Sequence, residues 1–228
     1  MQVELFSVAE SSVGEIETWC LSHQLRTVVG IDEAGRGPLA GPVYAAAVVL
    51  DFAQIDAPWL AGLDDSKKLS TAQREVAYDA IIENARAWAI TSSDNQRIDQ
   101  INILQATFRA MEAALEQVCA QLEEPPQCVF IDGNLPIQTA LRQRAIVKGD
   151  GRSLHIAAAS ILAKVARDRI MADHDQRWPE YGFASHKGYP TQAHRKAIEV
   201  FGPCAIHRLS FGGVREHADR LRDDSDLV

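Results

Sequence analysis

The sequence of 228 residues is poor in cysteine, and its four cysteines form no CxxC pair and no cluster with histidine. Scattered cysteines of this kind favour reduced thiols over disulfides or a zinc site. No apolar run approaches the roughly 20 residues that a membrane-spanning helix needs. The N-terminus also lacks a basic start followed by a long apolar stretch. We therefore expect a cytoplasmic protein without a secretory signal or membrane contact.

The chain also lacks an overall excess of positive charge, since its formal net charge is −8. The charge is nevertheless unevenly distributed. Residues 1–141 carry 8 basic and 20 acidic side chains, whereas residues 142–222 carry 15 basic and 8 acidic ones. The basic C-terminal half can contact nucleic acid even though the whole protein is acidic. It can equally be a solvated helical surface, and charge alone does not decide between the two.

The length suits one α/β domain, or one domain with a small appendage, and the sequence has no internal repeat. We predict strands at 26–32, 43–50, 87–91, 128–131 and 144–148. We predict helices at 71–85, 101–122, 153–173, 192–200 and 214–221, and residues 15–23 can form another. A Gly-rich turn joins the first two strands, which indicates antiparallel neighbours. This order predicts a mixed central sheet flanked by helices, with a helical C-terminal extension.

Acidic side chains stand where three of these strands end: Asp32 and Glu33 at the first, then Asp132 and Asp150. Active sites of open α/β sheets gather at such edges. Clustered carboxylates cannot all stay ionised near neutral pH without a cation. Oxygen ligands without Cys or His neighbours favour Mg²⁺ or Mn²⁺, and such a cluster suits two-metal phosphodiester hydrolysis. For a lone Asp-Gly pair, as at 132–133 or 150–151, a turn residue is the simpler interpretation.

The segment 30–42, GIDEAGRGPLAGP, is rich in glycine but does not match the dinucleotide-binding fingerprint, because a strand follows it. The sequence also has no GxxxxGK[ST] motif. We interpret Gly35, Arg36 and Gly37 as a place where the backbone can approach a sugar–phosphate chain closely. A plain tight turn is the alternative.

Two further segments offer hydrogen-bond donors. Residues 65–70, DSKKLS, include Ser66 and Lys67, which suit phosphate, and Ser70, which is placed to cap the helix at 71–85. Residues 186–191, HKGYPT, place Tyr189 close to Lys187. A tyrosine can stack on a sugar or hydrogen-bond to the 2′-hydroxyl, the group that distinguishes RNA from DNA. A tyrosine buried in the core is the alternative.

Together these segments resemble the signature blocks of bacterial ribonuclease HII, a type 2 ribonuclease H family. The blocks are GIDEAGRGPLAGPVYAAAVVL, DDSKKLS, INILQAT, FIDGN, AIVKGDGRS, AAASILAKVARDR, YGFASHKGYPT and GPCAIHRLSF, in family order from about residue 27 to residue 214. The chain has KGDGRSLHIAAAS where many members have a sequence like KGDxRVPEISAAS. Ser153, Leu154 and His155 therefore leave the local substrate contacts open.

The resemblance implies a ribonuclease H-like fold and a metal-dependent endonuclease. It implies that two Mg²⁺ or Mn²⁺ ions bind at four catalytic acids, which are Asp32, Glu33, Asp132 and Asp150. The implied substrates are the RNA strand of RNA–DNA hybrids and duplex DNA, nicked 5′ of an embedded ribonucleotide to leave a 3′-hydroxyl and a 5′-phosphate. This activity would serve ribonucleotide excision repair.

The resemblance also implies roles in substrate binding. The turn Gly35-Arg36-Gly37 would read the RNA–DNA junction from the minor groove, and Tyr189 would sense the 2′-hydroxyl. Ser66, Lys67 and Lys187 would contact phosphates. We expect a monomer that binds nucleic acid and needs no small-molecule cofactor.

We divide the chain into a lead-in segment (1–25), a catalytic domain (26–175), a helical extension packed on it (176–222) and a frayed tail (223–228). Two other functions remain open. One is a different ribonuclease H-like nuclease, such as a DNA exonuclease or a resolvase, against which the GRG turn and the KGYPT block argue. The other is a catalytically silent hybrid-binding module, against which the retained acids argue.

Overall fold

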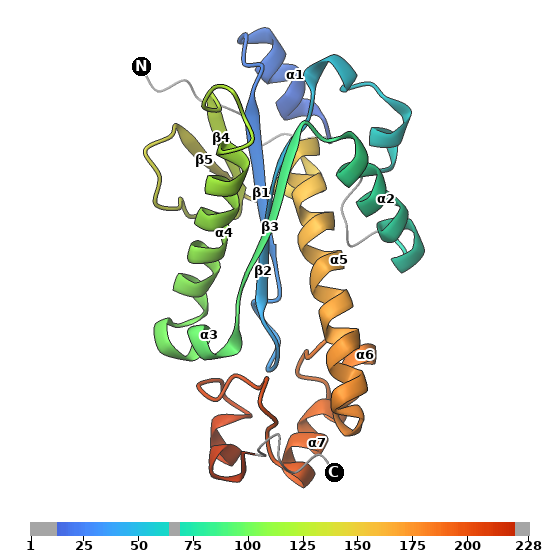
Figure 1. Cartoon of the computed structure of the whole chain (residues 1–228), viewed down its shortest axis with the longest axis vertical. Helices are drawn as coiled ribbons and strands as arrows, with labels where there is room; N and C mark the ends of the chain where they lie inside the picture. Colours follow the sequence, from blue (N-terminus) through green and yellow to red (C-terminus); the bar gives the residue numbers. More distant parts are fainter. Residues whose placement is uncertain (1–12, 64–68, 222–228) are drawn as a thin grey trace.

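A five-stranded mixed sheet forms the centre of the protein, in a computed structural model that describes residues 13–63 and 69–221 (Figure 1). The strand order is β3-β2-β1-β4-β5. The strands are β1 (Val28–Ala34), β2 (Val43–Val49), β3 (Ala87–Ser93), β4 (Cys128–Asp132) and β5 (Gln143–Ile146). β2 is antiparallel to both β1 and β3, whereas β4 is parallel to both β1 and β5. The predicted mixed sheet and the antiparallel first pair are confirmed.

Helices cover both faces of this sheet (Figure 1). The α-helices are α1 (Glu15–Ser22), α2 (Thr71–Asn84), α3 (Asn95–Ile101), α4 (Ile103–Cys119), α5 (Leu154–Arg177), α6 (Phe183–His186) and α7 (Gln192–Phe201). Short 3₁₀ helices are η1 (Phe52–Gln54), η2 (Pro58–Gly62), η3 (Gly149–Gly151), η4 (Pro179–Tyr181) and η5 (Arg215–Arg220). None of the described helices combines the length and apolarity that crossing a bilayer requires.

The two faces of the sheet have separate cores because successive strand residues point to opposite sides. On one face, Val29 and Ile31 of β1 pack with the apolar stripe of α4, which confirms that this stripe belongs to the core. On the other face lies α5, whose buried Ala157 packs in a second core with β2 and α2. A Cβ atom at Gly30 would lie 2.2 Å from the His155 carbonyl carbon. Glycine at position 30 therefore lets α5 lie directly on β1.

Several predicted boundaries need correction. The helix predicted at 101–122 is α4, which begins at Ile103 because Asn102 has a φ of 66° and caps it, and which ends at Cys119. The preceding short helix α3 was not predicted. β1 continues to Ala34 because it still pairs with β2 beyond Asp32. α5 runs to Arg177, and the segment predicted as a helix at 214–221 is the 3₁₀ helix η5. The predicted cap is confirmed, since Ser70 forms a reciprocal capping box with Gln73.

The lead-in helix α1 is fastened to the start of α5 by a buried polar cluster. The Glu17 carboxylate accepts hydrogen bonds from Ser153 Oγ at 2.6 Å and from His155 Nδ1 at 2.9 Å. All three side chains are buried. Ser153 and His155, which depart from the family pattern, thus contact α1 in this chain. The four cysteines are free thiols, as predicted.

Candidate active site

Asp32 and Asp132 lie side by side on two neighbouring parallel strands, just beyond the last paired residues of β1 and β4. The register of β1 and β4 pairs Ile31 with Ile131, so the next residue on each strand is an aspartate. Val29 and Ile31 face α4, and alternation therefore turns Asp32 toward α5. Asp32 is only 5% exposed. The register therefore brings two of the predicted acids together at this edge of the sheet.

The environment of Asp32 disfavours its ionised form. Burial raises the pKa of Asp32 well above its usual value, and the nearby Glu33 and Asp132 carboxylates raise it further. Two hydrogen bonds oppose the rise in this pKa, one from the Glu33 backbone N–H at 2.7 Å and one from the Ser160 side chain. Ser160 comes from α5 and is itself buried. The sequence did not identify Ser160 as a site residue, because it resembles the other small residues of that helix.

Glu33 stands at the mouth of the site, where its carboxylate pairs with Arg36 at 3.3 Å. Burial raises the pKa of Glu33, Arg36 opposes the rise, and Asp132 adds to it. The Glu33 side chain is 16% exposed and that of Arg36 is 50% exposed. The charged group of Arg36 therefore lies on the solvent side of the acids. Its position next to the acids in the sequence suggested this placement.

The turn that precedes α5 closes the site on the side of β4. The Gly149 backbone N–H donates to Asp132 Oδ1 at 2.6 Å. Asp150, the next residue, is 5% exposed, and its Oδ1 accepts the Gly151 N–H at 3.1 Å. This contact brings the turn with Asp150 against Asp132. All four predicted acids thus belong to one end of the sheet.

The donor set consists of buried and half-buried carboxylates that repel one another, which is the chemistry that fits a hard divalent cation. Asp32, Glu33 and Asp132 are close enough to shift one another's protonation. Yet among the residues that the structure describes, no three His, Cys, Asp or Glu side chains are grouped as a ready-made ligand set. The assignment of all four acids as metal ligands therefore stays a prediction.

Two buried arginines hold the glycine-rich loop beside the acids. Arg208 donates to four backbone carbonyls of this loop: Gly35 at 2.6 Å, Arg36 at 2.9 Å, Pro38 at 2.8 Å and Gly41 at 3.0 Å. Arg167, on α5, donates to the carbonyls of Ala40 and Pro42 at 3.2 and 3.0 Å. Gly35 has a φ of 99°, and a Cβ there would lie 2.0 Å from Arg167 Nε. Gly35 is therefore required both for its conformation and for this close packing.

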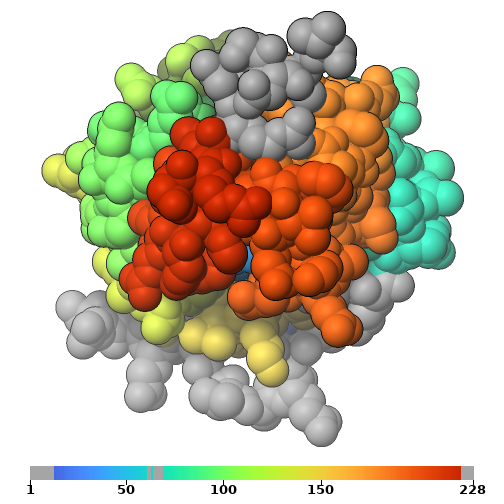
Figure 2. Space-filling model, turned by 90° about the horizontal axis from the view of Figure 1, so that it is seen from below, coloured from blue at the N-terminus to red at the C-terminus, as the bar shows by residue number. Residues whose placement is uncertain are grey.

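The sequence did not reveal that these two arginines support the loop beside the acids. Each lies within a block that resembles the family, but no local pattern marks an arginine as fully buried. Arg208 comes from the C-terminal segment, which also pairs with the loop through Ala40 and His207. In Figure 2 the orange and red C-terminal segments cover this end of the molecule, with a small blue part visible between them.

Tyr189 lies on the loop's outer side. A Cβ at Gly37 would be 3.5 Å from the Tyr189 ring, and the Gly188 carbonyl accepts the Leu39 N–H at 2.8 Å. Tyr189 is 43% exposed, so the alternative of a core tyrosine is wrong. Lys187 precedes it in a left-handed conformation with a φ of 52°. The other two predicted phosphate contacts, Ser66 and Lys67, lie outside the described residues.

Known proteins resemble the chain over most of its length. The family model for ribonuclease HII matches residues 29–214. Ribonuclease HII of Geobacter sulfurreducens is 49% identical over 213 residues, which cover 93% of this chain and 94% of the relative. The ribonuclease H2 structure from Pyrococcus horikoshii OT3 superposes with a TM-score of 0.70 at 26% identity, covering 85% of this chain and 98% of that one.

A second solved structure shares the fold at lower identity. Bst-RNase HIII in complex with Mn²⁺ superposes with a TM-score of 0.66 at 21% identity, covering 87% of this chain and 71% of that one. The predicted ribonuclease H-like fold is confirmed by these neighbours. The span of the family match and the identity to the Geobacter protein establish the relationship, and the chain belongs to the ribonuclease HII family of metal-dependent nucleases.

Proposed function

We propose that this protein cleaves the RNA strand of RNA–DNA hybrids and nicks duplex DNA 5′ of an embedded ribonucleotide. Asp32, Glu33, Asp132 and Asp150 would hold two Mg²⁺ or Mn²⁺ ions. The products would carry 3′-hydroxyl and 5′-phosphate ends. The observation that carries the proposal is the pair Asp32 and Asp132, adjacent on parallel strands and buried enough to disfavour two unscreened charges.

The acids would contribute through their position and charge. Bound divalent ions at such carboxylates activate water and stabilise the leaving oxygen of a phosphodiester. Ser160 holds the buried Asp32 carboxylate, and the Gly149 N–H fixes Asp132, so both enter the site pre-oriented. The Glu33 carboxylate pairs with Arg36, whose exposed guanidinium lies where a substrate phosphate can displace one partner of the pair.

Selectivity for a ribonucleotide would come from the glycine-rich loop and Tyr189. Arg208 binds the loop through backbone carbonyls, which leaves the loop rigid and its outer side open to a sugar–phosphate chain. The exposed Tyr189 ring lies over Gly37 within reach of the same chain. A site that hydrogen-bonds to a 2′-hydroxyl disfavours deoxyribose, because a polar group then remains unpaired.

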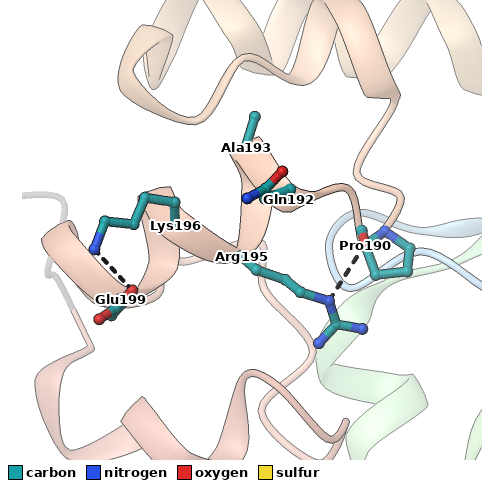
Figure 3. A pocket seen from close by; sticks show the side chains of 6 residues that line it. All are labelled: Pro190, Gln192, Ala193, Arg195, Lys196 and Glu199. Atoms are coloured by element: carbon teal, nitrogen blue, oxygen red, sulfur yellow. Dashed lines mark hydrogen bonds and ion pairs between the residues drawn. The ribbon is translucent and has the colours of Figure 1, made fainter.

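A hollow next to Tyr189 runs along α7 and continues the exposed surface formed by the glycine-rich loop and Tyr189 (Figure 3). It is lined by Pro190, Gln192, Ala193, Arg195, Lys196 and Glu199. Lys196 pairs with Glu199 at 3.0 Å, whereas Arg195 donates to the Pro190 carbonyl at 3.3 Å. An arginine held by a neutral carbonyl keeps its charge available, so Arg195 joins Lys187 as a candidate phosphate contact.

The test of the acids uses Asp150→Asn and, as a matched control, Asp168→Asn. Asp168 is an aspartate further along α5 that pairs with Lys164. On a duplex with one ribonucleotide, Asp150→Asn should lose at least about 100-fold in rate, because a lost metal ligand removes several kcal/mol of transition-state stabilisation. Asp168→Asn should cleave at nearly the wild-type rate. Equal rates for the two variants would reject the assignment of Asp150.

The other candidate functions predict different results with the same substrates. A DNA exonuclease would degrade a ribonucleotide-free duplex and a resolvase would cut a ribonucleotide-free branched junction, whereas this protein should leave both intact. A hybrid-binding module would retain an RNA–DNA hybrid without cutting it when Mg²⁺ or Mn²⁺ is added. Running both substrates with each metal in turn also decides which ion supports cleavage.

A further inference from the structure

Two histidines form a buried hydrogen-bonded chain behind Tyr189. His194 Nε2 lies 3.0 Å from His207 Nε2, and both side chains are completely buried. At one end, His194 Nδ1 lies 3.0 Å from the Tyr189 carbonyl oxygen. At the other end, the Cys204 backbone N–H donates to His207 Nδ1 at 2.9 Å. The chain thus joins three separate segments of the C-terminal region.

The position of every ring proton follows from these contacts. His207 Nδ1 lies 2.9 Å from the Cys204 backbone N, 3.1 Å from its Sγ and 3.3 Å from its carbonyl oxygen. The shortest contact is with the backbone N–H, which can only donate, and the Tyr189 carbonyl at the other end can only accept; both ends agree if His207 Nδ1 accepts from Cys204 and carries no proton. Neutral His207 therefore has its proton on Nε2 and donates it to His194 Nε2. His194 Nε2 is then the acceptor, so the His194 proton is on Nδ1, from which it donates to the Tyr189 carbonyl. A proton added to either ring would set two N–H groups against each other.

The surroundings favour two neutral rings. Phe183 packs edge-on against His194 at 5.4 Å between ring centroids, and Tyr181 lies 5.0 Å from His207. His186 stacks on His194 at 4.5 Å between ring centroids. Burial in this aromatic setting lowers the pKa of His194 to about 4 and that of His207 to about 3.

The chain ends on the backbone of the residue that carries the exposed ring. The Tyr189 carbonyl also accepts the Thr191 N–H at 2.8 Å, and the Tyr189 N–H donates to the His186 carbonyl at 2.9 Å. The backbone of Tyr189 is therefore fixed on both sides, while its side chain projects over Gly37. With the backbone fixed, only the two side-chain torsions of Tyr189 decide where its ring lies, so the ring is restricted to a few rotamer positions.

We propose that His194 and His207 are positioning residues that hold Tyr189 over the glycine-rich loop and thereby set selectivity for a ribonucleotide. The inference rests on the proposed role of Tyr189 at the 2′-hydroxyl. Neither histidine contacts the substrate side of the loop, and both act through the Tyr189 carbonyl.

The first experiment observes the proton positions directly. In the ¹⁵N-labelled full-length protein at pH 7, correlation of ring nitrogens with ring protons reports which nitrogen of each histidine is protonated. We expect His207 protonated only on Nε2 and His194 only on Nδ1. The proposal is overturned if His194 is protonated on Nε2, or if either ring is doubly protonated at this pH. This measurement needs no substitution and does not depend on activity.

The second experiment separates positioning from general stability with a double-mutant cycle of His194→Phe and Tyr189→Phe. His194→Phe keeps a ring but removes the donor, and displacement of a recognition group by about 1 Å can cost up to ~100-fold in rate. We expect His194→Phe to reduce kcat/KM on a single-ribonucleotide duplex at least about tenfold. In the Tyr189→Phe background the same substitution should cost little more, because coupled residues are not additive.

Conservative replacement provides the matched control. His194→Asn places an amide N–H near the position of Nδ1, so it should recover most of the activity that His194→Phe loses. If His194→Phe reduces kcat/KM equally in the wild-type and in the Tyr189→Phe background, its role is merely structural and the proposal is overturned. If Tyr189→Phe alone has no effect, the proposed ribose contact is wrong, and the ring-proton measurement still decides whether the histidine chain exists.

Discussion

Replacing Asp132 by asparagine should abolish cleavage and yet make the metal-free protein more stable. Asp132 and Asp32 occupy neighbouring positions on parallel strands, and such strands lie about 4.8 Å apart. Two unit charges at this separation repel by about 3 kcal/mol at an effective dielectric constant of about 20. The raised pKa of Asp32 indicates that protonation already relieves part of this repulsion. We therefore expect a gain of about 1–3 kcal/mol in the free energy of unfolding.

The substitution preserves the local structure because the asparagine side chain keeps Oδ1. That oxygen can still accept the Gly149 N–H, which in the wild type donates to Asp132 Oδ1 at 2.6 Å. The assay is urea unfolding of the wild type and of Asp132→Asn, first in EDTA and then in excess MnCl₂. Bound metal should stabilise the wild type by about 2.7 kcal/mol at a concentration of 100 times Kd. The variant should gain much less from the metal.

The measurements in EDTA and in MnCl₂ test the same acidic cluster, the first through the repulsion that Asp132→Asn removes and the second through the metal binding that it weakens. Asp168→Asn removes an acid elsewhere on α5. It should relieve no repulsion within the cluster in EDTA, and it should leave the increase in stability caused by Mn²⁺ unchanged. If Asp132→Asn is less stable than the wild type in EDTA and gains as much from Mn²⁺, Asp132 belongs to no cation-binding cluster. The reasoning from strand register to metal binding would then be refuted.

Three further predictions concern the scaffold around the site. Gly30→Ala should lower the free energy of unfolding, measured by urea unfolding, by about 4 kcal/mol or more, because the added Cβ would lie 2.2 Å from a backbone carbon of α5. Gly212→Ala is the control and should be nearly neutral, because a Cβ there meets open space. Arg208→Met should cost about 3–5 kcal/mol, since it leaves four loop carbonyls without their donor; a loss below about 1 kcal/mol would contradict the buried network. The lowered pKa values of His194 and His207, about 4 and about 3, contribute stability that is present above the unfolded pKa of about 6.5 and is lost as pH falls. Between pH 7.5 and pH 5 each histidine should therefore remove about 2 kcal/mol, and a variant with both replaced by phenylalanine should lose correspondingly less over the same range.

The sequence by itself determined the local elements and the chemistry of the site. Strand and helix periods, the Ser70 cap and the Gly-rich turn depend on neighbouring residues, so they can be read without knowing the fold. The acids at strand ends and the family blocks predicted a carboxylate site and its nuclease activity. One error was of boundary, since the helix predicted from residue 101 begins only at Ile103, after the left-handed Asn102. Another was an omission, since α3 is too short, with Ile98 as its buried residue, to give a clear periodic signal.

Only the tertiary structure decided which residues hold the site together. Register placed Asp32 beside Asp132, and close packing of α5 brought Ser160 to the same carboxylate. The burial of Arg208 against loop carbonyls 167 to 173 residues away and the pairing of His194 with His207 are contacts between distant segments. Hydrogen bonds of this kind depend on the three-dimensional positions of donors and acceptors, and residue types along the chain do not encode these positions locally.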